Sequence, residues 1–482
     1  MKRIILLCIF LAGSLFMSRA KVQLPPVFAD NMVLQQQTDA ALWGKAKPDA
    51  KVAITPSWSK KKTVVMSDSE GKWSARVATP EAGGPYEITF SDGEKVTLKN
   101  VMIGEVWICS GQSNMAMPMM GYRGQPVEGS AEYIVKARPE VPIRTCIVEK
   151  NLSFEVNDTC SARWLEHTPD AVAVSSATAY FFAQSLYQAL NVPVGIVNVS
   201  YGDTPIEGWM DPELLRTEFA GEFDLSHFET KVWPEKNLHK LPGVLYNGML
   251  HSVMPYTAKG FLWYQGCSNR KRFEQYVRLQ PAFARMLRRD WDNEQMPFYF
   301  VQIAPYRASN PDKKRGGFMM WAQAQTLELI PRSGMVCLHD AGDFYCVHPP
   351  KKKVVGDRLS YLALSNDYGI DAVDLKTPIP IKFEFNEGEA IVSFNNCEHR
   401  GIGPIWKELE GFELAGEDQV FYPAKATVII NKPRNQISVK CPEVPNPVAV
   451  RYGIRNWSVA TLFNGSGIPV TPFRSDNWEY RR

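Results

Sequence analysis

The feature that most constrains the fold is an alternation of short apolar runs with longer segments of helical spacing, between about residues 101 and 370. The apolar runs expected to form buried strands are Val101–Ser110, Pro193–Ser200, Ala258–Tyr264, Phe298–Ile303 and Gly334–Leu338. Ala177–Leu190 and Phe273–Trp291 have the spacing of helices that bury one face. Strands that are apolar throughout and alternate with helices are typical of a parallel sheet covered on both faces. The sequence therefore predicts an α/β domain over residues 101–370.

The segments on either side of this region predict β structure. Residues 21–100 contain strand-like runs at Lys51–Thr55, Lys72–Val77 and Tyr86–Phe90, separated by turn residues such as Ser69-Glu70-Gly71. Short strands at this spacing favour a small β-sandwich. Residues 371–482 are expected to form a second β-rich domain, with strands at Ile379–Phe385, Glu389–Phe394, Ala426–Asn431 and Val448–Tyr452.

The first residues indicate export. Met1-Lys2-Arg3 precedes an apolar run from Ile4 to Phe16, and Ser18-Arg19-Ala20 supplies the small residues of a cleavage site. This order is typical of a secretory signal peptide over residues 1–20, and the run is shorter than the ~20 residues that a spanning helix needs. We expect a periplasmic or extracellular protein with no membrane insertion after cleavage. Losing this segment brings the formal net charge from +3 to zero, so we expect no nucleic-acid partner.

The most informative motif follows the first apolar run. Val101–Ser110 leads into Gly111-Gln112-Ser113-Asn114, which places Ser113 in a tight turn at the carboxyl end of a strand. Ligands bind at that edge of open α/β sheets, and the Ser113 N–H could face an oxyanion there. Met115 stands where a G-x-S-x-G elbow would have its second glycine. For this motif taken alone, a serine that only caps a helix is the alternative.

Further candidate site residues follow three later strands of the predicted sheet. Gly202 follows the second run, Asn269 follows the third, and His348 lies in the loop after the last. Because the carboxyl ends of parallel strands meet at one edge, we expect these residues to lie near Ser113. An acyl-transfer site needs a nucleophile, a base within hydrogen-bond reach, and donors aimed at the developing oxyanion.

The order Ser, Gly, Asn, His resembles the SGNH (GDSL-like) hydrolases, and more narrowly the sialate O-acetylesterase family. The matching segments are Val106–Met115, Gly195–Trp209, Leu245–Met249, Phe261–Asn269, Asp340–Leu359, Leu409–Phe412 and Pro472–Asp476. The resemblance covers nearly the whole chain after the leader. It implies a flavodoxin-like parallel sheet in the hydrolase domain and an enzyme that hydrolyses acetyl esters on carbohydrates.

The resemblance also implies roles for individual residues. Ser113 would be the nucleophile, and His348 would be the general base and then the acid for the departing sugar hydroxyl. The backbone N–H groups of Ser113 and Gly202 and the side-chain amide of Asn269 would form the oxyanion hole, with Gln112 beside them as a substrate-binding residue. No metal and no organic cofactor is expected.

Two positions depart from the family pattern. The family usually has Glu where this chain has Cys267, and often has Asp where it has Cys346. Because both exchanges are to cysteine and both fall in loops expected at the active site, we hypothesise a Cys267–Cys346 disulfide in an exported protein. Two independent thiols are the alternative. Cys146 and Cys160 are a further candidate pair.

Without the usual acid, another group must orient His348. Asp343, five residues upstream, is the first candidate and is predicted to be catalytic; Asp340 and a backbone carbonyl are the others. A metal site formed by His339, Asp340, Asp343 and His348 is an alternative, but the Ser and Asn motifs would then have no function.

The favoured substrate is O-acetylated sialic acid, and an acetylated glycan is therefore the expected partner. Arg123 and Arg307 are candidates for contacting the sialic acid carboxylate because both lie in loops near strand ends. Acetylated plant polysaccharide, such as xylan or pectin, is the second enzyme interpretation. A secreted carbohydrate-binding protein that has lost catalysis is the third. The oligomeric state does not follow from the sequence.

Overall fold

One long strand joins two parts of the molecule. β7 (Lys95–Gly111) pairs antiparallel with β6 (Gly83–Ser91) in its first half, and parallel with β10 (Val194–Ser200) and β11 (Gly260–Tyr264) in its second half. The boundary expected near residue 100 therefore falls inside a continuous strand rather than in a linker. The computed structural model describes residues 21–405, 408–430 and 434–479, so the leader lies outside the described residues.

The N-terminal strands form two sheets whose buried residues belong to the same hydrophobic cluster as part of the central domain. β1, β3 and β4 extend the sheet that β6 and β7 share, whereas β2 and β5 form a separate antiparallel pair. Their bounds are β1 Val33–Gln35, β2 Asp39–Lys45, β3 Lys51–Pro56, β4 Thr63–Met66 and β5 Lys72–Ala78. In β5 buried and exposed residues alternate, as in a strand with one face on a core.

The central sheet has the strand order β13-β12-β11-β7-β10-β8-β9, in which only the pairing of β9 with β8 is antiparallel. The remaining bounds are β8 Ile143–Val148, β9 Ala162–Leu165, β12 Phe298–Val301 and β13 Ser333–Val336. β10 and β11 are buried along their whole length, because helices cover both faces of the sheet. The predicted α/β architecture is confirmed, but the sheet is mixed rather than wholly parallel because β9 pairs antiparallel with β8.

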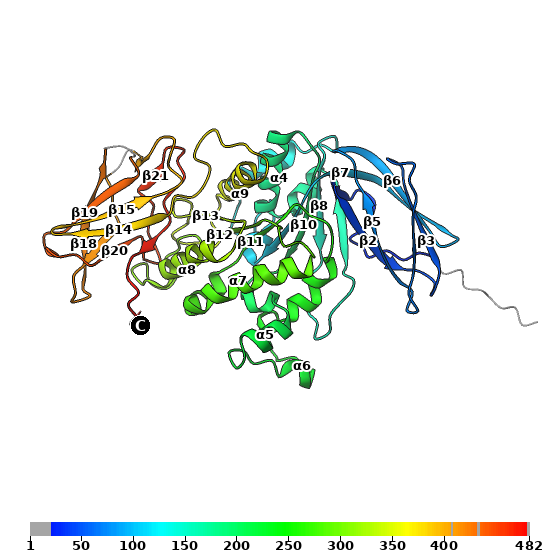
Figure 1. Ribbon diagram of the computed structural model, residues 1–482, viewed down its shortest axis with the longest axis horizontal. Helices are drawn as coiled ribbons and strands as arrows, with labels where there is room; N and C mark the ends of the chain where they lie inside the picture. The colour runs from blue at the N-terminus through cyan, green and yellow to red at the C-terminus, as the bar shows by residue number, and fades with distance from the viewer. Residues whose placement is uncertain (1–20, 406–407, 431–433, 480–482) are drawn as a thin grey trace, which may run out of the picture.

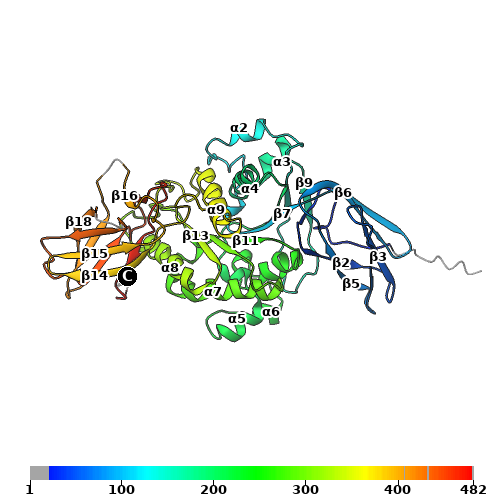
Figure 2. The same ribbon diagram turned by 45° about the horizontal axis from the view of Figure 1, so that its top comes forward.

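Helices α4 (Ala177–Leu190) and α9 (Lys352–Asp367) pack together on one face, and α7 (Phe273–Asp290) and α8 (Arg315–Leu329) cover the other (Figures 1 and 2). α4 begins at a Ser176 cap that accepts the Ala179 N–H, and ends where Asn191 takes the left-handed conformation. The shorter helices are α1 Ser113–Ala116, α2 Ser130–Val135, α3 Pro169–Val174, α5 Pro212–Glu218, α6 His227–Thr230 and η1–η5 at Ile206–Trp209, Leu238–Lys240, Tyr246–Leu250, His251–Val253 and Cys267–Arg272.

The C-terminal region is a separate β-rich unit at the opposite end from the N-terminal strands (Figure 1). Its seven-stranded antiparallel sheet has the order β14-β15-β19-β18-β17-β20-β22, and β16 pairs with β21. The bounds are β14 Pro380–Asn386, β15 Glu389–Phe394, β16 Ile402–Pro404, β17 Phe412–Ala415, β18 Phe421–Ile429, β19 Gln436–Lys440, β20 Ala449–Tyr452, β21 Leu462–Asn464 and β22 Phe473–Arg474. Gln302 donates to Thr471 (2.7 Å), which joins this unit to the end of β12.

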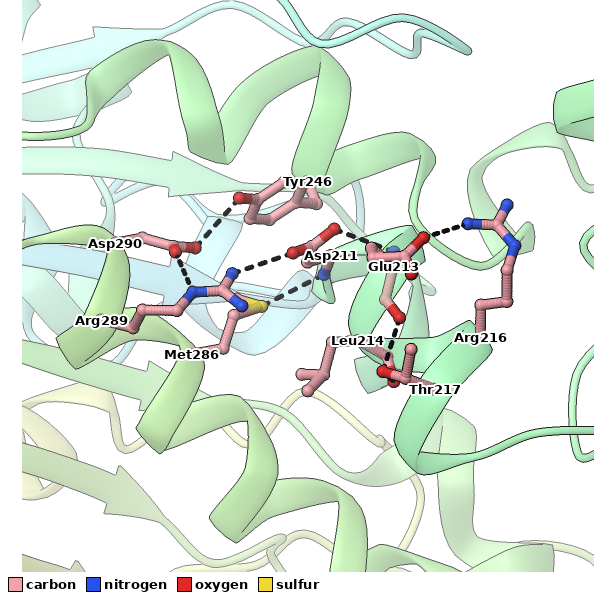
Figure 3. Close-up of polar contacts among 9 residues, drawn as sticks. All are labelled: Asp211, Glu213, Leu214, Arg216, Thr217, Tyr246, Met286, Arg289 and Asp290. Atoms are coloured by element: carbon pink, nitrogen blue, oxygen red, sulfur yellow. Dashed lines mark hydrogen bonds and ion pairs between the residues drawn. The ribbon is translucent and has the colours of Figure 1, made fainter.

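The chain segment that follows β10 is held in place at α5 by ion pairs (Figure 3). Asp211 caps α5 by accepting the Glu213 N–H at 2.9 Å, and its other carboxylate oxygen lies 2.9 Å from Arg289 near the end of α7. Arg289 also contacts Asp290 (2.6 Å), which accepts the Tyr246 hydroxyl hydrogen (3.0 Å). These contacts fix the far end of the segment that begins at Gly202.

Among the described residues, no helix has the length and apolar character needed to cross a bilayer.

Candidate active site

The four predicted site residues lie after four different strands of the central sheet. Ser113 follows β7, Gly202 follows β10, Asn269 follows β11, and His348 lies between β13 and α9. β10 and β11 flank β7 on opposite sides, so the chain changes its direction of winding at β7. The carboxyl edge at such a change is where open α/β sheets bind ligands. The structure therefore places the four residues after the strands at which the sequence predicts them.

The turn before Ser113 depends on a glycine. Gly111 has a φ of +142°, and a β carbon at that position would lie 2.3 Å from the carbonyl oxygen of Tyr264. The next residue, Gln112, donates its N–H to that oxygen (3.0 Å) and accepts the Gly266 N–H on its side-chain oxygen (3.1 Å). Gln112 is buried, so its side chain ties the ends of β7 and β11 together where the sequence predicts a substrate contact.

Ser113 and His348 form a hydrogen-bonded pair, with 2.7 Å between the serine Oγ and the histidine Nε2. The other imidazole nitrogen, Nδ1, lies 2.6 Å from the Oε1 atom of Gln125. Because an amide oxygen can only accept, Nδ1 carries the proton and Nε2 accepts the Ser113 hydroxyl hydrogen. The Tyr122 ring packs edge-on against the imidazole, with the two centroids 5.3 Å apart.

The acidic residues that were candidates for orienting His348 have other partners. Asp343 accepts the backbone N–H groups of Tyr345 (2.8 Å) and Cys346 (2.7 Å), and so shapes the loop before the histidine. Asp340 forms a two-pronged ion pair with Arg358, at 2.7 and 2.6 Å. In this structure neither carboxylate contacts the imidazole, and the catalytic role of Asp343 stays a prediction.

The neutral side chain of Gln125 takes that place. Sequence reasoning missed this residue because it lies in the loop between α1 and α2, 223 residues from His348 along the chain. No motif or spacing in the sequence marks it. Only the folded chain brings this loop against the histidine.

The environment keeps His348 neutral. Burial, and to a smaller extent the nearby Lys352 cation, lower its pKa from 6.5 to about 4. The imidazole is therefore unprotonated at neutral pH, as a group that accepts a proton from serine must be.

The Asn269 amide is held in one orientation. Its oxygen accepts from Gln265 (2.7 Å) and from the Ile206 N–H (3.0 Å), while its nitrogen donates to Glu207 at 2.9 Å. Since an amide nitrogen carries two hydrogens, one remains for a further acceptor. Gly202 lies directly against the nucleophile, because a β carbon at that position would be 3.4 Å from the β carbon of Ser113.

The cysteine exchanges do not produce a disulfide. Cys267 and Cys346 are both free thiols, as are the other six cysteines in the described part of the chain, including Cys146 and Cys160. The Cys346 sulfur instead accepts the His348 N–H at 3.4 Å, and burial raises the pKa of the Cys267 thiol. The hypothesised Cys267–Cys346 bridge is therefore replaced by two separate thiols.

Three aromatic residues near the ends of β10 and β11 are part of the core. Trp209 and Trp263 are fully buried, and Tyr264 is 1 % exposed. Trp209 donates its indole N–H to Thr204 at 3.0 Å, which packs the segment after Gly202 against the sheet. All three side chains therefore contribute to core packing.

Comparison with known proteins agrees with this geometry. Residues 103–344 match the sequence profile described as "Carbohydrate esterase, sialic acid-specific acetylesterase". The sialate O-acetylesterases of Pongo abelii and Homo sapiens are each 28% identical over 490 residues, covering 92% of this chain and 90% of theirs. A crystal structure described as a novel carbohydrate acetylesterase from Xanthomonas citri is 30% identical, with a TM-score of 0.85 over 95% of this chain and 100% of the other.

The fold, the site and these likenesses define a carbohydrate esterase. The chain belongs to the sialic acid-specific acetylesterase family. The interpretation as an enzyme is thus confirmed over that of a binding protein without catalysis.

Proposed function

We propose that this esterase removes O-acetyl groups from sialic acids, with Ser113 as nucleophile and His348 as general base. The observation that carries the proposal is the 2.7 Å contact between the Ser113 hydroxyl and the unprotonated nitrogen of His348. Nucleophile and base are within hydrogen-bond reach, as covalent catalysis requires. We also propose that the central part is an SGNH-type, flavodoxin-like hydrolase domain, on the order of its four site residues.

In the first step the Ser113 oxygen attacks the acetyl carbonyl carbon while its proton moves to Nε2 of His348. The tetrahedral intermediate expels the ester oxygen of the sugar, which takes the proton from His348 to become a hydroxyl, and an acetyl-serine remains. Water then attacks the acetyl-serine while His348 accepts one of its protons, and the second tetrahedral intermediate expels the Ser113 oxygen, which takes that proton back as acetate leaves. The Gln125 oxygen holds the Nδ1 proton throughout, which keeps Nε2 directed at the serine.

The oxyanion of each intermediate needs preorganised donors. The N–H groups of Ser113 and Gly202 donate to no acceptor in the described part of the chain, and Asn269 has one amide hydrogen unused. A β carbon added at Gly202 would be in van der Waals contact with Ser113, and this proximity supports the Gly202 N–H as one of the donors. Removing one such donor typically raises the barrier by about 3–4 kcal/mol.

Sialic acid differs from neutral sugars by its carboxylate. Arg123 is exposed, lies on the same loop as Gln125 and has no ion pair among the described residues, so it is available to a carboxylate. Arg307 is the weaker candidate because its guanidinium lies over the rings of Phe344 and Tyr345, 5.8 and 5.3 Å from their centroids. The names of the relatives support sialic acid, and the Xanthomonas citri structure supports acetylated carbohydrate more broadly.

The test is acetate release by the purified chain and by Ser113→Ala. The substrates are 9-O-acetylated sialic acid, acetylated xylan and 4-nitrophenyl acetate. We expect the sialic acid ester to give the highest kcat/KM and Ser113→Ala to lose at least about 10⁴-fold on all three. Retained activity in Ser113→Ala would refute the mechanism. A clear preference for acetylated xylan would replace the substrate and keep the mechanism.

Export is a further proposal, supported by the signal-like order of residues 1–20, which lie outside the described part of the chain. Expression of the full chain in a Gram-negative host should give a periplasmic or extracellular product whose N-terminus lies near Lys21. A cytoplasmic product that begins at Met1 would refute it.

A further inference from the structure

A buried cation lies directly behind the Ser113–His348 pair. Lys352 is the first residue of α9, and its side chain has no exposure to solvent. A positive charge is unfavourable at the start of a helix and costly in the protein interior. A lysine held in such a place calls for an explanation from its contacts.

Those contacts connect the two halves of the site. The Lys352 ammonium donates to the side-chain oxygen of Asn114 at 2.5 Å, and the Asn114 nitrogen donates to the carbonyl oxygen of Val347 at 3.1 Å. Asn114 is the residue after the nucleophile, and Val347 is the residue before the histidine. One amide thus joins the serine turn, the histidine loop and α9.

Four titratable groups that are not carboxylates surround this cation. They are the thiols of Cys267 and Cys346, the phenol of Tyr264, whose ring centroid lies 5.8 Å from the Lys352 nitrogen, and the imidazole of His348. In the described part of the chain no carboxylate lies within ion-pair distance of Lys352. The two thiols occupy the positions where the family pattern has acids, so the charged group behind this histidine is a cation without a carboxylate partner.

We infer that Lys352 is a positioning residue of this esterase, which holds the Ser113 turn and the His348 loop together through the Asn114 side chain and places a positive charge behind the imidazole. The inference rests on the proposed function of Ser113 and His348. The charge makes the imidazolium less favourable, so the histidine stays a neutral base down to acidic pH. Burial lowers the pKa of Lys352 itself to about 7, against a smaller opposing effect of the two thiols.

The test compares Lys352→Met with Asn114→Leu, using the pH dependence of kcat/KM for 4-nitrophenyl acetate between about pH 4 and 8. Lys352→Met keeps the volume of the side chain and removes the charge and the hydrogen bond. We expect kcat to fall about tenfold and the acidic limb to move to higher pH by about one unit. Asn114→Leu should lower kcat by a similar factor with a smaller movement of the limb, since the charge remains.

The double variant shows whether the two residues act as one chain. Its loss of kcat should match the larger single loss within about twofold rather than the product of the two. The matched control is Lys353→Met, which removes an exposed neighbour that pairs with Asp357 at 2.5 Å. That control should keep both kcat and the acidic limb.

Lys352→Met with the kcat and the limb of the control would overturn the inference. If Lys352→Met cannot be purified folded, an unchanged kcat in Asn114→Leu overturns it instead, and a tenfold loss with an intact fold supports it. Ser113→Ala separates this result from the proposed function. Activity retained there refutes the mechanism, whereas an inactive Ser113→Ala beside a fully active Lys352→Met refutes only the role of Lys352.

Discussion

Two buried cations in this molecule have opposite surroundings: one lies against a carboxylate and the other does not. Arg451 on β20 makes two hydrogen bonds to Asp476, at 2.8 and 2.7 Å, and its guanidinium lies 3.8 Å from the centroid of the Phe421 ring. Arg474 shares the same carboxylate. Lys352 at the active site has an amide oxygen and two thiols around it. The first cation is neutralised, and the second is not.

The difference separates a charge used for stability from a charge used at a site. Around Arg451 a carboxylate and an aromatic face offset the loss of hydration. Around Lys352 the Tyr264 ring lies 5.8 Å away, but no carboxylate lies within ion-pair distance in the described residues, so the fold bears the cost of an unpaired charge beside the reacting pair. Local disagreements with folding rules of this sort concentrate at functional sites.

The largest effect is expected at the neutralised cluster. Asp476→Ala would leave two buried guanidinium groups without a carboxylate and should lower the free energy of unfolding by about 3–5 kcal/mol. Urea unfolding measures this, and kcat at low temperature should stay at the wild-type value. Asp418→Ala, in an exposed loop of the same unit, is the control with a loss below about 1 kcal/mol. Equal losses in the two variants would contradict the contrast.

The second prediction concerns the unpaired cation and has the opposite sign. The folded-state pKa of Lys352 is lowered to about 7 from 10.5, so the folded chain disfavours the charged form. Stability from this group is therefore reduced below pH 7 and recovers as the pH rises toward 10.5. Lys352→Met should be more stable than wild type by a few kcal/mol near pH 6, and the gain should shrink by pH 10.

Urea unfolding of both proteins at several pH values checks this, because other groups that titrate cancel in the difference. A Lys352→Met variant less stable than wild type near pH 6 would mean that the Asn114 hydrogen bond outweighs the cost of the buried charge. The comparison of the two cations would then fail.

The third prediction concerns a negative charge introduced next to the histidine. Gln125→Glu would put a carboxylate at Nδ1, stabilise the imidazolium, and move the acidic limb of kcat/KM upward from about pH 4 by one unit or more. Gln125→Ala should only lose the orienting hydrogen bond, about 1–1.5 kcal/mol or tenfold in kcat. If neither variant alters the profile, Gln125 does not hold the imidazole.

The sequence predicts the elements whose pattern is simple. The helical spacing of Ala177–Leu190 gives the bounds of α4, and the apolar run Pro193–Ser200 predicts β10 to within one residue. The strand ends carry Ser113, Gly202, Asn269 and His348, and parallel topology alone brings them to one edge.

Helices α8 and α9 have no clear pattern because neighbours surround them. α9 buries Lys352, Arg358 and Ser360 along with its apolar residues, so it lacks a polar face that periodicity would detect. A β carbon at Gly356 would lie 2.5 Å from the β carbon of Phe181, which shows how closely α4 and α9 pack. The partner of His348 was missed for a related reason, since contacts between loops leave no local signature.

The smallest effect is expected at Asp343. The Asp343→Asn variant tests whether a carboxylate takes part in the active site. The Asp343 carboxylate accepts two backbone N–H groups at 2.8 and 2.7 Å, and the amide oxygen of Asp343→Asn can accept both. The loop before His348 should therefore keep its shape, with kcat within about threefold of wild type. Asp343→Ala, which lacks the acceptor, should lose more through disorder of that loop. A loss in Asp343→Asn of a hundredfold or more would mean that this carboxylate reaches the imidazole during turnover, and the histidine would then have an acid partner after all.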